Sequence, residues 1–361
     1  MTGQQKRGRL RRKPRVLWQS TRRLVVAVVM AKLYSGAAQS QAAQDLVTYT
    51  NPVVANGAAI HMGDPFAFRA KGRYFLTGTS SPDEGFRIYE SVDLVHWTDL
   101  GWALRKKPGF WSQGVLVAPE VRLYRGKYYL VYAGMPQNSR PPRVLLGLAV
   151  SDVPQGPYRS LYGPWFDPGY SAIDGDIFVD DDGTPYVYFS KNGQQEGYAY
   201  GKIYGARLSS DLSHTVGNPV ELMEASQAWE RVNWDKNRCN EGPTVFRRRG
   251  TYYMTYSAND TDFPTYGIGY ATATNPLGPW TKSAANPILE SDMRSGVSGP
   301  GHNSIVTSPD GRELFIVYHS HADSLHPSED RVVNIDRLIF DHSGKLRVAG
   351  PTRSPQPMPS H

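Results

Sequence analysis

Five segments of this chain carry a polar residue that could take part in acid–base chemistry, each shortly before a glycine turn and an aromatic-rich strand. Six to nine positions separate the polar residue from the turn glycine in every segment. The polar residues are Asp64, Glu120, Asp174, Glu241 and His302, and the turn glycines are Gly72, Gly126, Gly183, Gly250 and Gly311. Carboxyl groups and imidazoles are common proton-transfer groups in enzymes. A fold that brings these segments together would therefore assemble the groups for acid–base catalysis.

The spacing of the turn glycines predicts that fold. Consecutive turn glycines lie 54, 57, 67 and 61 residues apart. A repeat of this length, built from short strands and turns, is typical of a β-propeller with one blade per repeat. Apolar and polar residues alternate over short stretches, as half-buried strands require. We therefore predict an all-β chain that forms a five-bladed β-propeller, with the five polar residues directed towards its axis.

The composition agrees with one large β-domain. The 361 residues include 22 Tyr, 35 Gly and 27 Pro, and 20% of the residues are charged. Aromatic residues favour strands, while glycine and proline favour the tight turns between them. No CxxC, HExxH, GxSxG, Walker or GxGxxG pattern occurs in the sequence. This argues against the common zinc hydrolases, α/β-hydrolases, nucleotidases and dinucleotide-dependent enzymes.

The N-terminal segment differs from the rest in charge. Residues 1–44 contain ten Lys and Arg and no acidic residue, which leaves 30 basic and 33 acidic residues, a net charge of −3, in the remainder. A basic stretch, a short apolar run and small residues follow one another, as in an export signal. The Arg22–Arg23 pair before the apolar run resembles a twin-arginine signal. We predict an export leader over residues 1–44 and an exported, periplasmic or extracellular propeller over residues 45–361; a basic N-terminal arm or a misassigned start codon is the alternative.

Charge and hydropathy argue against two kinds of partner. Beyond the leader the sequence has no basic stripe, so no nucleic acid is expected to bind. The apolar run of the leader is too short to span a bilayer, so no membrane insertion of the mature chain is expected.

Cys239 is the single cysteine and cannot form an intramolecular disulfide. We expect a buried structural thiol there, since a nucleophile would need an exposed, electropositive site.

Three of the five polar residues are carboxylic acids followed directly by glycine or proline: Asp64, Asp174 and Glu241. Hydrolysis of a glycosidic bond needs one carboxylic acid to protonate the leaving oxygen and one carboxylate to act on the opposite face of the sugar. A third negative charge nearby helps to keep the acid protonated at neutral pH. Each acid alone would be an ordinary turn carboxylate. Their matching positions in three repeats favour catalysis.

On these motifs the chain resembles glycoside hydrolase family 43, the five-bladed propellers that include arabinofuranosidases, β-xylosidases and endo-arabinanases. The resemblance runs from about Asn51 to the C-terminus. Its motifs are the Asp64 segment, Ala118–Val121, Ile173–Asp174 with FVDDDGTPYVY, Asn240–Pro243, Gly299–Ser304, Tyr318–His319 and Arg331. It implies an inverting hydrolase in which Asp64 is the general base on water and Glu241 is the general acid. Asp174 would raise the pKa of Glu241 and orient it.

The resemblance implies further roles. His302 corresponds to an axial histidine that lies near a calcium ion or an ordered water in many members. A structural Ca²⁺ is therefore one expectation for this position, and a core histidine is the alternative. The chemistry itself is expected to require no cofactor. Arg331 corresponds to an arginine that binds sugar hydroxyls, and a surface arginine is its alternative. Phe66 is expected to stack on a sugar because it lies close to Asp64 in sequence. For Glu120 we expect a hydrogen-bonding role in substrate binding.

Three positions depart from the pattern of the family. Val117 stands where many members have tryptophan, which would make one wall of the pocket wider. Gly175 replaces a proline that often follows the third-blade aspartate, and Asn303 stands where close relatives often repeat histidine. None of these changes removes a catalytic carboxylate.

The function predicted from the sequence is an exo-acting glycoside hydrolase. It would remove α-L-arabinofuranosyl or β-D-xylosyl residues from plant-type polysaccharides or oligosaccharides. An endo-acting arabinanase would use the same residues in an open groove, and the sequence does not distinguish the two. A non-catalytic carbohydrate-binding propeller is the third possibility. That protein would be expected to lack at least one of the three acids, and all three are present.

Overall fold

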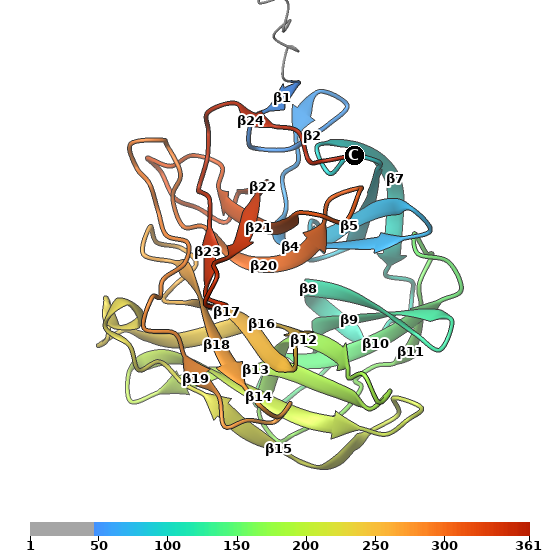
Figure 1. The fold of residues 1–361 in the computed structure, drawn as a ribbon. Coiled ribbons are helices and arrows are strands. Elements are labelled where there is room, and N and C mark those ends of the chain that lie inside the picture. Colours follow the sequence, from blue (N-terminus) through green and yellow to red (C-terminus); the bar gives the residue numbers. More distant parts are fainter. Residues whose placement is uncertain (1–46) are drawn as a thin grey trace, which may run out of the picture. The chain divides into compact units, whose positions relative to one another are not determined.

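Five blades of mainly antiparallel strands surround a common centre in the computed structural model, which describes residues 47–361. Twenty-four strands and one short 3₁₀ helix, η1 (Ala228–Arg231), make up this part of the chain. Figure 1 shows the first strand of each sheet beside the middle of the molecule and the later strands further out. The predicted all-β, five-bladed propeller is confirmed. The predicted export leader, residues 1–44, lies outside the described residues.

The five blades follow the sequence in order, with one blade for each predicted repeat. Blade 1 consists of β4 (Gly63–Ala70), β5 (Arg73–Thr79), β6 (Gly85–Ser91) and β7 (His96–Arg105), extended by β2 (Val54–Ala55) and β3 (Ala58–Ala59). Blade 2 consists of β8 (Ser112–Tyr124), β9 (Lys127–Pro136), β10 (Leu145–Ser151) and β11 (Arg159–Tyr162). Blade 3 consists of β12 (Ser171–Val179), β13 (Pro185–Gln195), β14 (Tyr198–Leu208) and β15 (Thr215–Met223).

The last two blades complete the ring. Blade 4 consists of β16 (Asn237–Arg248), β17 (Thr251–Ala258), β18 (Gly267–Ala273) and β19 (Thr281–Lys282). Blade 5 consists of β20 (Gly301–Thr307), β21 (Leu314–His321), β22 (Arg331–Phe340) and β23 (Leu346–Val348). A short parallel pairing of β14 with β16 joins blades 3 and 4. The two ends of the described chain meet where β1 (Thr48–Tyr49) pairs with β24 (Gln356–Pro357).

Five separate hydrophobic clusters hold neighbouring blades together. Leu76 of blade 1 packs with Val317 of blade 5, for example, and Phe189 of blade 3 packs with Leu146 of blade 2. Full burial of one such side chain contributes about 1.5–3 kcal/mol. Hydrogen bonds also cross from blade 5 to blade 1, where the N–H of Ala67 donates to Ser304 Oγ at 2.8 Å. The core therefore lies between the blades, and the axis is left to polar groups.

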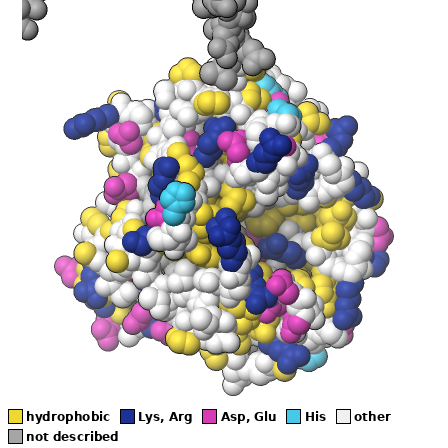
Figure 2. Space-filling view, viewed as in Figure 1, with side chains coloured by type: hydrophobic (Ala, Val, Ile, Leu, Met, Phe, Trp, Pro, Cys, Tyr) yellow, Lys and Arg dark blue, Asp and Glu magenta, His cyan; other side chains and the backbone are white. Residues whose placement is uncertain are grey.

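The face in view in Figure 2 is hollowed near its middle, and hydrophobic and basic side chains border the hollow. The only helix in residues 47–361 is η1, with four residues. No helix of this part of the chain is therefore long and apolar enough to cross a membrane.

Candidate active site

A repeated backbone irregularity places the candidate catalytic side chains. The first strand of every blade contains a β-bulge, and one residue at the bulge has a positive φ. These residues are Asp64 (49°), Ala118 (47°), Asp174 (55°), Gly242 (59°) and His302 (45°). A bulge bends its strand and redirects a side chain. Such a conformation is uncommon for residues other than glycine and clusters at functional sites.

The bulges also define which residues are equivalent between blades. Asp64, Asp174 and His302 occupy the same position, as the sequence predicts. Glu241 lies one residue before the bulge position of its blade, which is Gly242. Glu120 lies two residues after Ala118, so the prediction that it shares the register of Asp64 is wrong. Because Ala118 is not polar, the pattern of polar residues did not mark it in blade 2. Glu120 was therefore aligned with Asp64 instead of Ala118.

Asp64 is held as an ionised carboxylate. Its Oδ1 lies 2.9 Å from Arg331 Nη1, and its Oδ2 accepts a 2.6 Å hydrogen bond from Thr79 Oγ1. His302 and His319 lie further away, with Nδ1 at 3.4 and 3.6 Å from Oδ1. Burial by itself would raise the pKa of Asp64, but the charge of Arg331, then His302, and the hydrogen bond of Thr79 hold it well below its usual value. Asp64 is therefore an acceptor of protons and hydrogen bonds at neutral pH.

The backbone next to Asp64 is fixed by two neighbours. The N–H of Asp64 donates to His319 Nδ1 at 3.0 Å. Burial and the charge of Arg331 lower the pKa of His319 well below its usual value, so this imidazole is neutral and its Nδ1 accepts. Gly63 makes room for the guanidinium, because a Cβ there would lie 2.2 Å from Arg331 Cζ. Any side chain at position 63 would displace the partner of Asp64.

Asp174 lies in an almost fully buried position, 3% exposed. Its Oδ2 accepts hydrogen bonds from Ser190 Oγ at 2.8 Å and from the N–H of Gly242 at 3.1 Å. Burial first, and then the negative charge of Asp64, raise the pKa of Asp174 to about 7, although the two hydrogen bonds oppose the shift. The bond to Gly242 ties Asp174 to the residue that follows Glu241.

Glu241 lies beside Asp174 and is partly exposed. Burial of its carboxyl group, followed by the charge of Asp174, raises the pKa of Glu241 to about 7. Tyr266 donates a hydrogen bond to Glu241 Oε1 at 2.9 Å, and the Cys239 thiol donates to the same carboxyl group. Both donors and the nearby His302 oppose the upward shift. Below about pH 7 the site therefore combines an ionised Asp64 with a protonated carboxyl group at Glu241, and Glu241 and Asp174 lose their protons over the same range.

Replacing Asp174 by asparagine (Asp174→Asn) is expected to stabilise the fold at pH 8 by about 1–3 kcal/mol and to have little effect at pH 4. The pKa of this aspartate rises from its usual 3.8 to about 7 in the folded protein, so the native state keeps a proton that the unfolded chain releases. Stability therefore falls as pH rises through that window, and a neutral amide avoids the loss. Urea unfolding of both proteins at the two pH values measures the difference. A variant that gains nothing at pH 8 would contradict the raised pKa.

The structure brings five of the seven predicted site residues together: Asp64, Asp174, Glu241, His302 and Arg331. Arg331 is 8% exposed and its guanidinium faces Asp64, so it does not lie on the surface. Its Nη2 also lies 3.4 Å from Glu329 Oε2. His302 is 5% exposed, and its N–H donates to Ser257 Oγ at 2.8 Å.

Glu120 does not reach this group. It is 4% exposed and lies with Asp176 and Arg122, deeper along the first strands than Asp174. Arg122 Nη2 contacts Asp176 Oδ1 at 2.8 Å. Burial, and then the charge of Asp176, raise the pKa of Glu120 well above its usual value. Glu120 is therefore a neutral acid in the axial core, and the substrate contact expected for it is not supported.

Phe66 also lies away from the group. It is 6% exposed and packs in the hydrophobic cluster between blades 1 and 2. It lines a cavity of about 590 Å³ formed by the later residues of the first strands, beyond the bulges, together with Val121, Thr244 and Ile305. Because those residues follow the bulges of the first strands in blades 1, 2, 4 and 5, this cavity lies towards the other end of the axis. The expected stacking of Phe66 on a sugar is not supported.

A second cavity, of about 410 Å³, borders Glu241 directly. Valine and isoleucine side chains form part of its wall, and neutral polar side chains form much of the rest. The lining residues include Val115, Val117, Val144, Ile173, Asn192, Tyr200, Asn237, Cys239, Asn259 and Thr261. Cys239 is 5% exposed and buried as predicted, but its contact with Glu241 was not foreseen. Val117 contributes a small side chain to this wall, as the sequence suggested.

Three partners of the candidate acids were missed from the sequence. Thr79, Ser190 and Tyr266 lie on second strands or on the loop before β18, outside the first-strand segments that repeat. His319 lies in a motif shared with the family, but nothing in its spacing indicated that its imidazole accepts the N–H of Asp64.

The fold and the group of carboxyl and basic residues at one end of its axis define a class of protein, the propeller-shaped glycoside hydrolases. The family model for glycosyl hydrolases family 43 matches residues 49–346. The chain belongs to glycoside hydrolase family 43, and it is an O-glycosyl hydrolase with a carbohydrate substrate. The resemblance inferred from the sequence motifs is confirmed.

Individual relatives agree with this assignment. A crystal structure of a thermostable family-43 glycoside hydrolase is 45% identical, with a TM-score of 0.82 over 87% of this chain and all of that chain. The β-D-galactofuranosidase xynD of Aspergillus niger is 27% identical over 84% of this chain and 87% of its own length. An extracellular exo-α-(1→5)-L-arabinofuranosidase of Streptomyces avermitilis is 25% identical over 82% of this chain, which spans 61% of that relative. Further relatives are named as arabinofuranosidase, β-xylosidase and endo-arabinanase.

Proposed function

We propose that this chain is an inverting, exo-acting glycosidase that removes α-L-arabinofuranosyl residues, or β-D-xylosyl residues, from oligosaccharides or polysaccharides. The observation that carries the proposal is the contrast between the surroundings of two carboxyl groups: Asp64 contacts Arg331 and Thr79, whereas the carboxyl group of Glu241 is buried beside Asp174. Arg331 and Thr79 hold Asp64 ionised, while burial and the charge of Asp174 raise the pKa of Glu241 to about 7, so that it carries a proton below that pH. An inverting glycosidase needs one base and one acid in these two states.

The proposed reaction is a single displacement. The Asp64 carboxylate accepts a proton from a water molecule while the water oxygen bonds to the anomeric carbon. Glu241 donates its proton to the glycosidic oxygen as the bond from that oxygen to the anomeric carbon breaks. The products are a free sugar of inverted configuration and the remaining alcohol. Asp64 ends protonated and Glu241 ionised, and exchange of one proton with solvent restores both.

Asp174 acts on this reaction through Glu241. Its charge disfavours a second anion, which supports a protonated Glu241 at neutral pH. Its hydrogen bond from the N–H of Gly242, at 3.1 Å, fixes the backbone beside the acid. No cofactor is required, because the two carboxyl groups supply both proton transfers.

The cavity beside Glu241 is assigned to the leaving group. A general acid must contact the leaving oxygen, so the leaving sugar lies on the side of Glu241. The valine and isoleucine surface suits the apolar face of a sugar, and the neutral amides suit its hydroxyls. A wall with Val117 in place of a large aromatic side chain leaves room for more than one sugar unit. These features support a carbohydrate leaving group.

Roles for Arg331 and His302 remain proposals. Arg331 is assigned to hold Asp64 and to bind sugar hydroxyls with its remaining donors. A calcium ion at His302 stays a prediction, and the donor set fits it poorly. No group of three or more His, Cys, Asp or Glu side chains within residues 47–361 is arranged to hold a metal ion. Calcium prefers hard oxygen ligands, so water would have to supply most of its shell there.

Export of the enzyme is also a proposal. The basic and apolar pattern of residues 1–44 supports it, as does the name of the Streptomyces avermitilis relative, which describes an extracellular enzyme. A polysaccharide substrate outside the cell would require export, since a polymer does not cross the membrane.

Initial rates on three nitrophenyl glycosides test the proposed function: α-L-arabinofuranoside, β-D-xyloside and β-D-galactofuranoside. The expected result is highest turnover on the arabinofuranoside. The galactofuranoside is included because of the Aspergillus niger relative, and because that sugar is an arabinofuranose with one additional carbon. Turnover of linear arabinan with none of the three nitrophenyl glycosides would replace exo action by endo action. Binding of these sugars without any hydrolysis would support the non-catalytic propeller instead.

A further inference from the structure

Tyr266 links the two sides of the candidate active site. It ends the loop between β17 and β18 and is 1% exposed. Its hydroxyl donates a hydrogen bond to Glu241 Oε1 at 2.9 Å. Burial first, and then the charge of Glu241, raise the pKa of Tyr266 well above its usual value. The phenol therefore keeps its proton and stays a donor over the working range of pH.

The ring of Tyr266 is fixed against the Asp64 side of the site. It lies parallel to the imidazole of His319, with ring centroids 5.8 Å apart and an interplanar angle of 2°. His319 in turn accepts the N–H of Asp64 at 3.0 Å. The ring also packs on Gly301, where a Cβ would lie 1.9 Å from Tyr266 Cε1. The phenol therefore has little freedom to turn away from Glu241.

The loop that carries Tyr266 is itself anchored. Asn259 Nδ2 donates to the carbonyl oxygens of Thr265 and Trp229, both at 2.9 Å. His321 Nε2 lies 2.8 Å from the carbonyl oxygen of Thr261. The loop is thus fastened to η1 and to blade 5, so the position of the hydroxyl is set by contacts outside the site.

We propose that Tyr266 is a positioning residue that fixes the orientation of the Glu241 carboxyl group and couples it, through His319, to the backbone of Asp64. A bond donated to Oε1 leaves Oε2 as the oxygen that carries the transferable proton. The inference rests on the proposed function, in which Glu241 is the acid.

The expected pH effect has a definite sign. A donor to the ionised form of a carboxyl group lowers its pKa. The other titratable groups facing Glu241 are Asp174, which raises its pKa, and Cys239 and His302, which lower it. Removing the hydroxyl of Tyr266 therefore raises the pKa of Glu241. Because Asp174 titrates in the same range of pH, the apparent pKa that is measured belongs to Asp174 and Glu241 together.

Tyr266→Phe is the test. We expect the alkaline limb of the kcat/KM profile to move up by about one pH unit. We also expect kcat to fall about ten-fold with little change in KM, because the acid is less well oriented. The matched control is Tyr256→Phe in the same blade. Tyr256 is also fully buried and donates to a buried carboxylate, Glu230 Oε1, at 2.7 Å.

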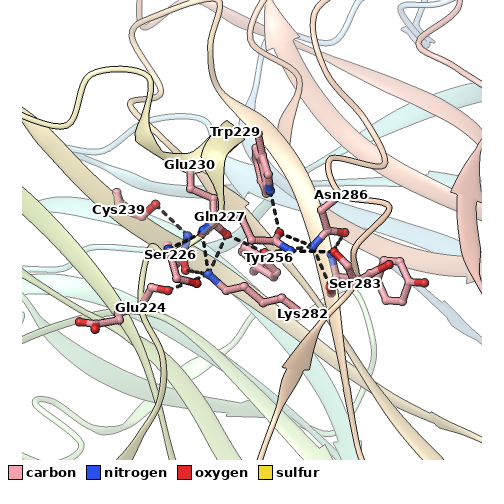
Figure 3. A network of polar contacts seen from close by, with 12 residues as sticks. Glu224, Ser226, Gln227, Trp229, Glu230, Cys239, Tyr256, Lys282, Ser283 and Asn286 are labelled. Carbon is pink, nitrogen blue, oxygen red and sulfur yellow. Dashed lines mark hydrogen bonds and ion pairs between the residues drawn. The ribbon is translucent and has the colours of Figure 1, made fainter.

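Figure 3 shows why Tyr256 is a fair control. Its hydroxyl belongs to a network in which Lys282 Nζ contacts Glu230 Oε1 at 2.7 Å and Asn286 Nδ2 contacts the same phenol oxygen at 3.2 Å. This network holds η1 and β19, and it reaches the residue next to Glu241 through Lys282 Nζ, which donates to Asn240 Oδ1 at 2.7 Å. The hydroxyl of Tyr256 itself bonds Glu230 and Asn286, and not the Glu241 carboxyl group. Loss of a buried hydrogen bond should therefore destabilise both variants, while only Tyr266→Phe should move the pH profile. Equal profiles in the two variants would contradict either the tyrosine contact or the role of Glu241 as the acid, and a direct titration decides which.

A direct titration separates the inference from the proposed function. ¹³C-labelled glutamate carboxyl signals give the pKa of Glu241 by NMR, with Glu241→Gln used to assign the signal. If the pKa of Glu241 rises in Tyr266→Phe but not in Tyr256→Phe, the contact between Tyr266 and Glu241 is supported. If this pKa does not rise in Tyr266→Phe, the contact is overturned. A shift in this titration without any movement of the rate profile would overturn the role of Glu241 as the acid.

Discussion

Glu241→Gln is expected to lower kcat on substrates with a sugar leaving group by about 10³–10⁴-fold. Glutamine has nearly the same shape as glutamate but has no proton to give to the leaving oxygen. A dinitrophenolate leaves without protonation, so the loss on a dinitrophenyl glycoside should be far smaller. The alkaline limb of the pH profile should also disappear, because the group with a pKa of about 7 that must be protonated is gone.

The control for this prediction is Glu290→Gln, a substitution at an exposed glutamate between β19 and β20. It should leave the rates on both kinds of substrate unchanged. The fold of Glu241→Gln should survive, since the amide still accepts the hydrogen bond of Tyr266 through its oxygen. An equal loss on good and poor leaving groups would argue that Glu241 is not the acid.

Asp64→Asn should have an effect of similar size, about 10³–10⁴-fold on kcat, but with a different pattern. An amide does not accept a proton from the attacking water, so a more reactive leaving group should not restore the rate. The change also leaves Arg331 without its carboxylate at 2.9 Å and removes a charge that raises the pKa of Asp174. The acidic limb of the pH–rate profile should also disappear, because it reports protonation of the general base, which the substitution removes.

A matched control is Asp182→Asn in the turn between β12 and β13. Asp182 is exposed and accepts the N–H of Thr184 at 2.8 Å, which an asparagine oxygen can also do. Rates should stay at the wild-type level. If a dinitrophenyl glycoside rescued Asp64→Asn as well as it rescues Glu241→Gln, the separate roles of base and acid would be contradicted.

The repeat of turn glycines was enough to predict the five blades, because each blade needs the same hairpin at the same distance. It also located Asp64, Asp174 and His302, which occupy equivalent bulges. It misplaced Glu120, because the true equivalent is Ala118, and a positive φ at an alanine leaves no mark in the sequence. The stacking expected for Phe66 is not supported, for a related reason. Nearness in sequence to Asp64 suggested a shared pocket, but the residues beyond the bulge line the other end of the axis.

The partners that tune the acids could not be predicted in the same way. Thr79 and Ser190 lie on second strands, at ordinary strand positions, and Tyr266 lies on a loop. Each contact joins residues distant in sequence, so it depends on how the blades are set beside one another. Tyr266 and Glu241, for example, are 25 residues apart and meet only because the loop before β18 folds back towards the axis.

The central claim is that Asp64 delivers water on one face of the sugar while Glu241 protonates the leaving oxygen on the other. The configuration of the first product tests it most directly. ¹H NMR of the glycoside that is hydrolysed fastest would show the anomeric signal of the new sugar before it equilibrates. We predict that the first sugar to appear has the configuration opposite to that of the substrate. A first product with the configuration of the substrate would mean a covalent intermediate and would contradict the account.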